Sequence, residues 1–430
     1  MIVGQDFLQK LWVFLFFIPI FTKHQTFNLY SMNNPFALTN EQLLDIANDL
    51  RQKIETGLQH DGHEIKCLPT YIHPNKEGIS GTATVFDLGG TNFRAAVVSV
   101  GQETKILGIA EKDITEMKTD GFTQENLFES QAQTINRLAL PADSPIGYCF
   151  SYPAKSLTNG DAELINWTKG VSIAGMAGKP IGVPLVDYLN KNTGSNFYKI
   201  AVVNDTITSL FAGLMNPGYD AYIGLIVGTG TNMATFFPSE YIPKIKDLKG
   251  WSGETPVNLE SGNFNPPHLT ILDEMVDAQS DNKGFQRFEK AISGMYIGRV
   301  FRAAFPNDSI DENMDGVGLS RMMNNPDAYK PEYVEIAFHI YERSAKLVAA
   351  SIAGLVMNLN SAYPSLKKIQ VLAEGSLFWS QVKTNDASYS GMANHCMKEL
   401  LIQMGLGGIE VQISKIENAN LIGAAMSVLS

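Results

Sequence analysis

Six consecutive residues, Asp87 to Asn92, have the types and spacing of a turn that binds nucleotide phosphates. This Asp-Leu-Gly-Gly-Thr-Asn turn lies between two apolar runs, 82–86 and 93–100, that are typical of strands. Its backbone N–H groups would line a concavity that suits phosphate oxygens. Asp87 could meet a nucleotide's Mg²⁺, and Arg94 offers a planar cation for the phosphates. The alternative is an ordinary hairpin, because Gly-Gly is common in such turns.

A second carboxylate, Asp205, stands where a strand-like run ends and a helix-like run begins. Ligands of open α/β sheets gather at the carboxyl ends of strands. A carboxylate placed there can accept the proton of a hydroxyl group while the hydroxyl oxygen attacks phosphorus. Equally, Asp205 could serve only as the N-cap of the helix.

A polar and aromatic segment, 166–170 (Asn-Trp-Thr-Lys-Gly), lies between these two carboxylates. Thr168 and Lys169 suit the hydroxyl groups of a sugar, and Lys169 could also stabilise charge on a transferred phosphoryl group. Ser151, at the end of an apolar run, could add a further hydroxyl contact. The alternative is a surface loop with a packed tryptophan.

Runs with the periodicity of strands and helices must position these residues. Glycine-rich turns near Gly89 and Gly228 are each flanked by strand-like runs, which predicts two α/β lobes that share a ligand cleft. The predicted helices are 40–58, with Thr39 and Gln42 as a capping box, 124–138, 184–190, 206–214, 285–304, 332–359 and 419–429. The predicted strands lie within 82–114 and at 146–151, 199–203, 222–227, 231–236, 368–373 and 409–413. A long polar loop is predicted at 247–268, and helical stretches are predicted to begin at Ser376 and Gly391.

Composition limits the classes of partner. The chain has 430 residues, enough for two domains, and a net charge of −11 that disfavours nucleic acid or an anionic membrane as the main partner. Three widely spaced cysteines, Cys67, Cys149 and Cys396, predict neither a disulfide framework nor a zinc site and favour the cytoplasm.

The N-terminal region has an apolar run, 11–21, that is too short to span a bilayer and is followed by no cleavage site of the signal-peptide type. Met32 begins a stretch typical of a natural protein start. We therefore expect residues 1–31 to be an upstream or dispensable extension, with a membrane anchor as the alternative.

Taken in order, these segments resemble the hexokinase family, single-unit hexokinase/glucokinase type, within the actin-like ATPase superfamily. The matching segments are 68–71, 86–94, 150–153, 167–170, 204–206, 228–232, 258–262, 286–290 and 293–296. Three positions depart from the family pattern. Glu374 stands where Asp is usual, the segment 419–422 (Ala-Asn-Leu-Ile) replaces Gly-Ser-Gly-Lys/Arg, and Ser261 replaces a frequent Trp. The departures leave the preferred phosphoryl donor open.

The resemblance implies an α/β, two-lobed actin-like ATPase (ribonuclease H-like) fold with a cleft between a small and a large domain. The small domain would comprise 67–205 and 418–430, and the large domain 32–66 and 206–417. The implied activity is transfer of the γ-phosphoryl group of ATP to the 6-hydroxyl of glucose, mannose or fructose, feeding glycolysis. The implied partners are a hexose and ATP with Mg²⁺, but no nucleic acid or membrane, and the protein would be a cytoplasmic monomer or homodimer.

The resemblance also implies the site residues. Asp205 would be the general base and Lys169 the second catalytic residue. The sugar would be held by Ser151, Thr168, Lys169, Asn204, Asp205, Asn232, Glu260 and Glu289. The nucleotide would be bound by Asp87, Gly89, Gly90, Thr91, Asn92, Arg94, Gly228, Thr229, Gly375 and Ser376, with Asp87 near Mg²⁺, through water. The residue pattern alone would not single out Glu260 and Glu289 among 44 acidic residues.

Three other functions are compatible with parts of the pattern. One is a kinase of another sugar or a polyol, against which the Trp-Thr-Lys-Gly segment argues. Another is a non-catalytic sugar sensor, which Asp205 and Lys169 oppose. The third is a chaperone-type ATPase, which would need a peptide-binding domain after the ATPase.

Overall fold

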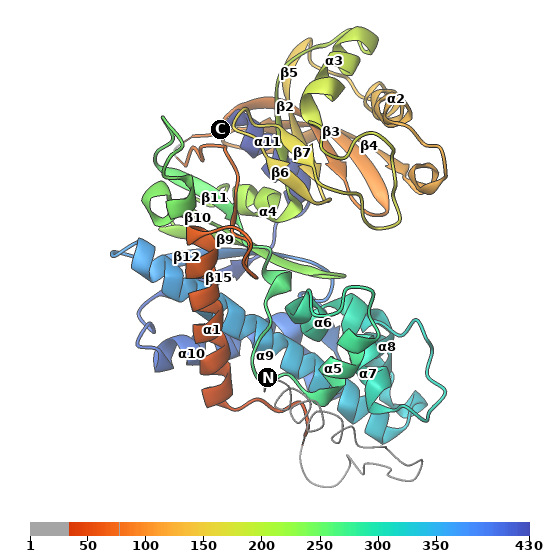
Figure 1. Ribbon diagram of the computed structural model, residues 1–430, viewed down its shortest axis with the longest axis vertical. Coiled ribbons are helices and arrows are strands. Elements are labelled where there is room, and N and C mark those ends of the chain that lie inside the picture. The colour runs from red at the N-terminus through yellow and green to blue at the C-terminus, as the bar shows by residue number, and fades with distance from the viewer. Residues whose placement is uncertain (1–33, 77) are drawn as a thin grey trace, which may run out of the picture. The chain divides into compact units, whose positions relative to one another are not determined.

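The computed structural model describes residues 34–76 and 78–430. From Leu38 to Ser430 the chain forms one compact unit. Its strands make a five-stranded sheet, a six-stranded sheet and two short strand pairs, and helices cover the two larger sheets (Figure 1).

The five-stranded sheet has the order β4-β3-β2-β5-β8. Its strands are β2 (Gly81–Leu88), β3 (Asn92–Val100), β4 (Lys105–Asp113), β5 (Asp143–Phe150) and β8 (Asn196–Val203). The first three in sequence pair in antiparallel fashion, whereas β5 runs parallel to β2 and β8 runs parallel to β5. The carboxyl ends of β2, β5 and β8 therefore meet at one edge of the sheet. Asp87, Ser151 and Asn204 lie at these three ends.

Alternate residues of β2 enter two separate cores. Ala83 and Val85 join the core that contains α11 (Ala419–Leu429). Phe86 and Leu88 join the core that contains α2 (Gln124–Ile135) and α3 (Gly182–Asn192). Both faces of the sheet are thus covered, which explains why its strands are almost continuously apolar. A short pair, β6 (Ala154–Ser156) and β7 (Ala162–Leu164), follows β5.

The six-stranded sheet has the order β1-β11-β10-β9-β12-β15. Its strands are β1 (Leu68–Pro69), β9 (Ala221–Val227), β10 (Thr231–Pro238), β11 (Glu254–Asn258), β12 (Lys368–Glu374) and β15 (Glu410–Ser414). β12 is parallel to β9 and β15, and the other pairs are antiparallel. The turn at residues 228–230 joins β9 to β10, and residue 374 ends β12 close to this turn.

Two helices connect the sheets. α4 (Asp205–Gly213) lies so close to β9 that a Cβ atom on Gly224 would be 2.6 Å from the carbonyl oxygen of Thr206. α11 approaches α4 as closely, because a Cβ atom on Gly423 would be 1.8 Å from the carbonyl oxygen of Thr208. One apolar core includes both helices together with residues of both sheets. The two sheets are therefore held to a common helical layer.

The longest helix, α9 (Pro331–Ala362), packs against α1 (Asn40–Gln59) and α10 (Tyr389–Gln403). Within residues 34–76 and 78–430 it is the one helix with the length and composition to cross a membrane. Because 78% of its most apolar window is buried inside the protein, its apolar character is accounted for by the core. A short pair, β13 (Gln381–Val382) and β14 (Ala387–Ser388), precedes α10.

Four shorter helices complete this half: α5 (Ile271–Ala278), α6 (Arg287–Ile292), α7 (Gly294–Ala304) and α8 (Gly316–Asn324). A bidentate ion pair fixes α5 to α9. The two terminal nitrogens of Arg343 donate to the two carboxylate oxygens of Asp273 at 2.7 and 2.8 Å. Both side chains are almost completely buried, at 1% and 2% exposure.

The sequence predictions agree with most of the longer elements and differ from the structure in the following places. The predicted loop 247–268 contains β11, whose Pro256 disfavours a strand in isolation. The predicted helix 285–304 is two helices, because Ser293 has extended dihedrals (φ −80°, ψ 157°) and is followed by a glycine. The predicted helix at Ser376 is only a turn. Helices α5 and α8 and the short strands β1, β6, β7, β13 and β14 were not predicted. The expectation for residues 1–31 concerns a segment outside the described residues, and the domain limits stay predictions.

Candidate active site

The first glycine turn is closed by a hydrogen bond from the Gly89 N–H to the carbonyl oxygen of Asn92 (3.1 Å). Asp87 and Arg94 are directly opposite in the β2–β3 register and form an ion pair through the Nη2 and Nε atoms of the arginine. Another nitrogen of Arg94 donates to the Oδ1 atom of Asn418 (3.4 Å). The side chain of Asp87 is largely buried, whereas that of Arg94 is partly exposed. The cation therefore already neutralises a carboxylate before any phosphate binds.

Asp205 is the first residue of α4 but does not cap it alone. The N-cap is Asn204, whose Oδ1 atom accepts the Thr206 N–H (2.9 Å). The Oδ1 atom of Asp205 accepts the same N–H group (2.9 Å). Its Oδ2 atom has no hydrogen-bond partner among the described residues, so one oxygen of this half-buried carboxylate is free to bind a ligand.

Lys169 lies over the first glycine turn. A Cβ atom on Gly90 would be 2.8 Å from the Cδ atom of Lys169. The ammonium group donates to the carbonyl oxygen of Ser151 (2.6 Å) and lies 5.3 Å from the centre of the Tyr152 ring. The residue itself has a left-handed backbone (φ 58°), which turns its side chain out of the 166–170 loop. Segments that are distant in the sequence thus place a cation beside the turn.

Asn232, Asn258 and Glu260 form a hydrogen-bonded chain at the ends of β10 and β11. The amide of Asn232 donates to Asn258 (2.8 Å), and the amide of Asn258 donates to the Oε1 atom of Glu260 (2.8 Å). The Oδ1 atom of Asn232 accepts the N–H groups of Met233 (2.8 Å) and Ser261 (3.1 Å). All three side chains are therefore held in one orientation.

Glu289, on α6, meets the second glycine turn. Its Oε2 atom accepts the N–H of Thr231 (3.0 Å), the residue that follows this turn. Burial raises the pKa of Glu289, and the nearby Glu260 raises it further, while Lys169 lowers it. Burial likewise raises the pKa of Glu260, and the Asp205 carboxylate adds to that rise. Three carboxylates and one ammonium group thus share one electrostatic environment.

The second glycine turn packs against the end of β12. The Gly228 N–H donates to the carbonyl oxygen of Gly230 (2.9 Å). Gly375 has a φ of +107°, and a Cβ atom there would be 2.2 Å from the carbonyl oxygen of Val227, so only glycine fits. Beside this contact lies a cavity of about 640 Å³. It is lined by Gly228, Thr229, Met295, Arg299, Arg321 and Ser376, among others.

These observations can be set beside known proteins. Hexokinase family models match residues 28–215 and, in two overlapping segments, 222–333 and 320–430. The chain belongs to the hexokinase family. Hexokinase-1 of Arabidopsis thaliana is 29% identical over 448 residues, covering 90% of this chain and 88% of its own length. Hexokinase-3 of Rattus norvegicus is 34% identical over 282 residues, covering 62% of this chain but 30% of its own length.

A solved hexokinase from Schistosoma mansoni in complex with glucose has a TM-score of 0.72 and 24% sequence identity, covering 92% of this chain and 96% of its own. A second solved hexokinase has a TM-score of 0.73 at the same identity. The predicted α/β, two-lobed fold class is therefore confirmed.

Within this hexokinase fold, the structure brings together most of the predicted sugar-binding residues. Lys169 contacts Ser151, and Asn232 is linked through Asn258 to Glu260. The Asp205 carboxylate raises the pKa of Glu260, and Glu260 raises the pKa of Glu289. Among the described residues, no hydrogen bond joins the Thr168 side chain to this group. Asn258, which positions both Asn232 and Glu260, was missed, although it lies in the quoted segment 258–262.

The family departure at Glu374 has a physical consequence. Burial raises the pKa of its carboxyl group to about 7, against the opposing effects of Lys415 and Arg94. Its Oε1 atom is buried without a hydrogen-bond partner. At a second departure from the family pattern, the segment 419–422, Asn420 lies in the first turn of α11. It accepts a hydrogen bond from the Thr208 hydroxyl (2.9 Å), which connects α11 to α4.

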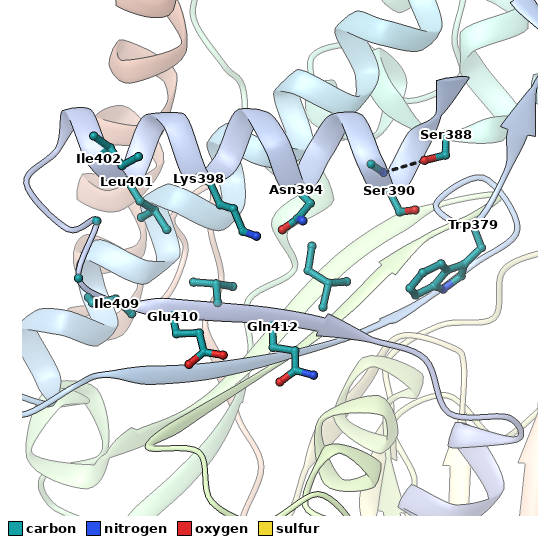
Figure 2. Close-up of a pocket in the computed structure, with 15 residues that line it drawn as sticks. Trp379, Ser388, Ser390, Asn394, Lys398, Leu401, Ile402, Ile409, Glu410 and Gln412 are labelled. Atoms are coloured by element: carbon teal, nitrogen blue, oxygen red, sulfur yellow. Dashed lines mark hydrogen bonds between the residues drawn. The ribbon is translucent and has the colours of Figure 1, made fainter. Parts of the chain in front are cut away.

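The described residues form two further large cavities. One, of about 770 Å³, includes Lys155 and Ile165 from the first half of the chain and Lys244 and Phe285 from the second. The other, of about 680 Å³, lies between α10 and β15 (Figure 2). Ser390, Asn394 and Lys398 face it at intervals of four residues, and Trp379 closes one end. The lining of this second cavity includes none of the predicted site residues.

Proposed function

We propose that this chain transfers the γ-phosphoryl group of ATP to the 6-hydroxyl of glucose or a related hexose. The observation that carries the proposal is the convergence of Asp205, Glu260 and Glu289 with Lys169. These residues come from four distant segments. Asp205 contributes to the raised pKa of Glu260, and Glu260 and Lys169 have opposite effects on the pKa of Glu289. Such a set of acceptors beside a cation suits a ligand with many hydroxyl groups that reacts with a phosphate.

Asp205 is the proposed general base. Its free Oδ2 oxygen can accept the proton of the sugar's primary hydroxyl, while its Oδ1 oxygen remains bound to the start of α4. A sugar hydroxyl is a weak acid, so the proton would leave late, and alignment of oxygen and phosphorus would supply much of the acceleration. The hydrogen bond to Thr206 fixes the carboxylate for this alignment.

Two of the other proposed sugar ligands are carboxylates that act as acceptors. Glu260 and Glu289 would accept hydrogen bonds from sugar hydroxyls, and carboxylates form strong bonds of this kind. The chain from Asn232 through Asn258 holds Glu260 in place. Closure of the protein around the sugar would exclude water, which otherwise competes for the phosphoryl group.

Lys169 and the two glycine turns are proposed to stabilise charge on the transferred group. Lys169 already lies against the first turn at Gly90. The cavity of about 640 Å³ beside Gly228 and Ser376 is large enough for the nucleoside part of ATP. Its lining includes two arginines, Arg299 and Arg321, which can donate hydrogen bonds to a nucleotide, together with two carboxylates, Glu312 and Asp315, which offset their charge.

Mg²⁺ is expected to arrive with ATP. Among the described residues no group of three or more His, Cys, Asp or Glu side chains could hold a metal ion. This fits Mg²⁺, which is commonly held by substrate phosphates and one or two carboxylates. Asp87 would be that carboxylate, acting through water, and the ion would neutralise charge on the phosphates.

The test is an assay of ADP release with glucose, mannose, fructose, glycerol and 6-deoxyglucose as acceptors. We expect activity with at least one hexose and none with 6-deoxyglucose, which lacks the attacking oxygen but retains the other hydroxyls. Phosphorus NMR of the product should place the phosphate at carbon six. Preference for glycerol would favour a polyol kinase, and sugar binding without ADP release would favour a sugar sensor.

The same assay addresses the donor. We propose ATP, and the cavity lining supports a nucleotide, but the altered segment 419–422 makes a comparison with other nucleoside triphosphates necessary. A cytoplasmic location and a place at the start of glycolysis belong to the proposal. The three cysteines, all buried and free, support a reducing compartment. Size-exclusion chromatography with light scattering would decide between monomer and homodimer.

A further inference from the structure

We infer that Glu289 links the sugar site to the phosphate site by holding the second glycine turn. This inference rests on the proposed function and deepens it, because it gives one sugar ligand a second task. The evidence is the contact between the Oε2 atom of Glu289 and the N–H of Thr231 (3.0 Å). Thr231 directly follows the turn at 228–230, which would face the γ-phosphate.

The contact is tight as well as polar. A Cβ atom on Gly230 would be 2.6 Å from the Oε2 atom of Glu289, closer than such atoms approach. A Cβ atom on Gly262 would be 3.6 Å from the same oxygen. The carboxylate is thus enclosed by the backbone of the turn on one side and by the Glu260 loop on the other. Movement of the carboxylate and movement of the turn are therefore linked.

The rest of the α6–α7 corner holds the same turn. The N–H groups of Gly294 and Met295 donate to the carbonyl oxygens of Gly228 (2.7 Å) and Thr229 (3.3 Å). The corner itself is rigid, because Ser293 donates to the carbonyl oxygen of Glu289 (2.9 Å) and ends α6 where α7 begins. Glu289 is the member of this corner that we propose as a sugar ligand.

The far side of α6 is fixed by a buried lysine. Lys290 donates to Asp277 (2.7 Å), to the hydroxyl of Ser280 (2.8 Å) and to the carbonyl oxygen of Asn282 (2.9 Å). These bonds use all three N–H groups of the ammonium. Because α6 is anchored there, a hydrogen bond from the sugar to the Oε1 atom of Glu289 would shift the position of the carboxylate and of the turn rather than that of the helix.

Two oxygens on one side chain are needed for this link. A glutamate can accept a sugar hydroxyl with one oxygen and the Thr231 N–H with the other. A glutamine has one acceptor oxygen and no charge. If that oxygen accepts the Thr231 N–H, the NH2 group that replaces the other oxygen can donate a hydrogen bond to the sugar but cannot accept one. Glu260 is the matched control, because within residues 34–76 and 78–430 its carboxylate accepts a hydrogen bond from Asn258 and none from the turn.

The experiment measures the affinity of a non-hydrolysable ATP analogue with Mg²⁺ by calorimetry, without and with saturating glucose. In the wild-type protein we expect glucose to tighten analogue binding by about five- to fiftyfold, within the usual range for coupled sites. In Glu289→Gln we expect the factor to fall below about twofold. In Glu260→Gln we expect it to stay within about threefold of wild type, although glucose itself binds more weakly.

Gly230→Ala provides a second, independent variant, because it displaces the carboxylate without removing a proposed ligand. Its coupling factor should fall as in Glu289→Gln, and it decides the question if that variant does not fold, as judged by circular dichroism. Equal coupling in Glu289→Gln and Glu260→Gln, or wild-type coupling in Gly230→Ala, would overturn the inference alone. A wild-type protein that binds no hexose would overturn the proposed function and the inference with it.

Discussion

At the scale of single residues, the site concentrates negative charge and controls it with a few donors. Burial raises the pKa values of Glu260 and Glu289, with a further rise from Asp205 at Glu260 and from Glu260 at Glu289. Lys169 and the amide of Asn258 oppose this rise. A sugar that donates hydrogen bonds to both carboxylates would replace the water they lose, which makes sugar binding and the ionised state mutually favourable.

Replacement of the proposed base should separate binding from chemistry. We expect Asp205→Ala to lower kcat by at least about 10²-fold, the usual contribution of a general base, while glucose affinity changes little. Steady-state kinetics with calorimetric glucose binding measures both. Asp187→Asn, an exposed aspartate on α3, is the control and should keep wild-type kcat. Normal turnover by the alanine variant would refute the assignment.

Glu260 should affect the sugar far more than the nucleotide. We expect Glu260→Gln to raise the KM for glucose by about 10- to 100-fold, as for loss of a hydrogen bond to a charged group, and the KM for ATP by less than about threefold. Initial rates over a grid of both substrates give the two constants. Equal rises in both would put Glu260 outside the sugar pocket.

Glu374 should give the protein a pH-dependent stability. Its folded-state pKa of about 7 is above the ordinary value of 4.5, so its favourable contribution is complete below pH 4.5 and is lost as the pH rises through 7. We expect Glu374→Gln to be more stable than wild type at pH 8 by about 1–2 kcal/mol, allowing for partial exposure, and to show little difference at pH 5.

Urea unfolding of both proteins at the two pH values measures this difference. A gain in stability that is the same at pH 5 and pH 8 would show that titration of Glu374 is not its cause.

At the scale of elements, the sugar and phosphate residues are carried by ends of strands and starts of helices. α5 and α6 are too short to be stable alone and depend on buried ion pairs. The Asp273–Arg343 pair fixes α5 to α9, and the Asp277–Lys290 pair fixes α6 to α5. These pairs thus determine where Glu289 lies.

Loss of one partner of the deeper pair should be costly. We expect Arg343→Met to lower the free energy of unfolding by about 3–5 kcal/mol, because it leaves the Asp273 carboxylate buried without its cation. Urea denaturation measures the loss. The control is Glu342→Gln on the same helix, which breaks a half-exposed pair with Lys346 and should cost under about 0.5 kcal/mol. Equal losses would contradict the assignment.

Element prediction succeeded where local signals were strong. The capping box of Thr39 and Gln42 begins α1 as predicted, and α11 spans Ala419–Leu429 as predicted. β11 was missed because its pairing with β10 and β1, not its five residues, makes it a strand. The break at Ser293 was missed because the apolar periodicity continues through it. Its cause is tertiary: Gly294 binds Gly228 instead of continuing one helix.

The site residues, like the elements, could be predicted where the signal is local and not where it depends on tertiary contacts. The glycine turns and Asp205 can be recognised from local sequence, because strand ends and turns have short signatures. Glu260 and Glu289 could be named only through the family resemblance, since their roles depend on the fold. Glu289 accepts a hydrogen bond from Thr231, 58 positions away, and Glu260 is held by Asn258, which Asn232 of another strand holds in turn. The raised pKa of Glu374 depends on burial and could not be read from its motif.

At the scale of the whole molecule, the layer of α4 and α11 connects the two sheets. Both helices contact a single core that includes strands from each side. Because Asp205 begins α4 and α11 packs beneath the first sheet, the proposed base is placed by the element that joins the halves. A change in the separation of the two sheets would therefore move the Asp205 carboxylate directly.

A side chain between these helices should destabilise the entire protein. We expect Gly423→Ala to lower the free energy of unfolding by at least about 2 kcal/mol despite the better helix propensity of alanine, because its Cβ would be 1.8 Å from the Thr208 carbonyl oxygen. Thermal and urea unfolding measure this. Gly408→Ala, where no atom lies within 4 Å, should change stability by less than about 0.5 kcal/mol. Similar effects at both positions would contradict the packing argument.

The hydrogen-bonded chain of Asn232, Asn258 and Glu260 determines which kind of hydrogen bond Asn232 can form with a ligand. Backbone N–H groups of Met233 and Ser261 use the oxygen of Asn232, and Asn258 uses one hydrogen of its amide nitrogen. What remains for a ligand is a single N–H, so Asn232 can give a hydrogen bond but cannot receive one. The sugar oxygen that meets it must present a lone pair. Fluorine in place of that one hydroxyl should be tolerated, whereas the same exchange opposite a carboxylate should abolish recognition.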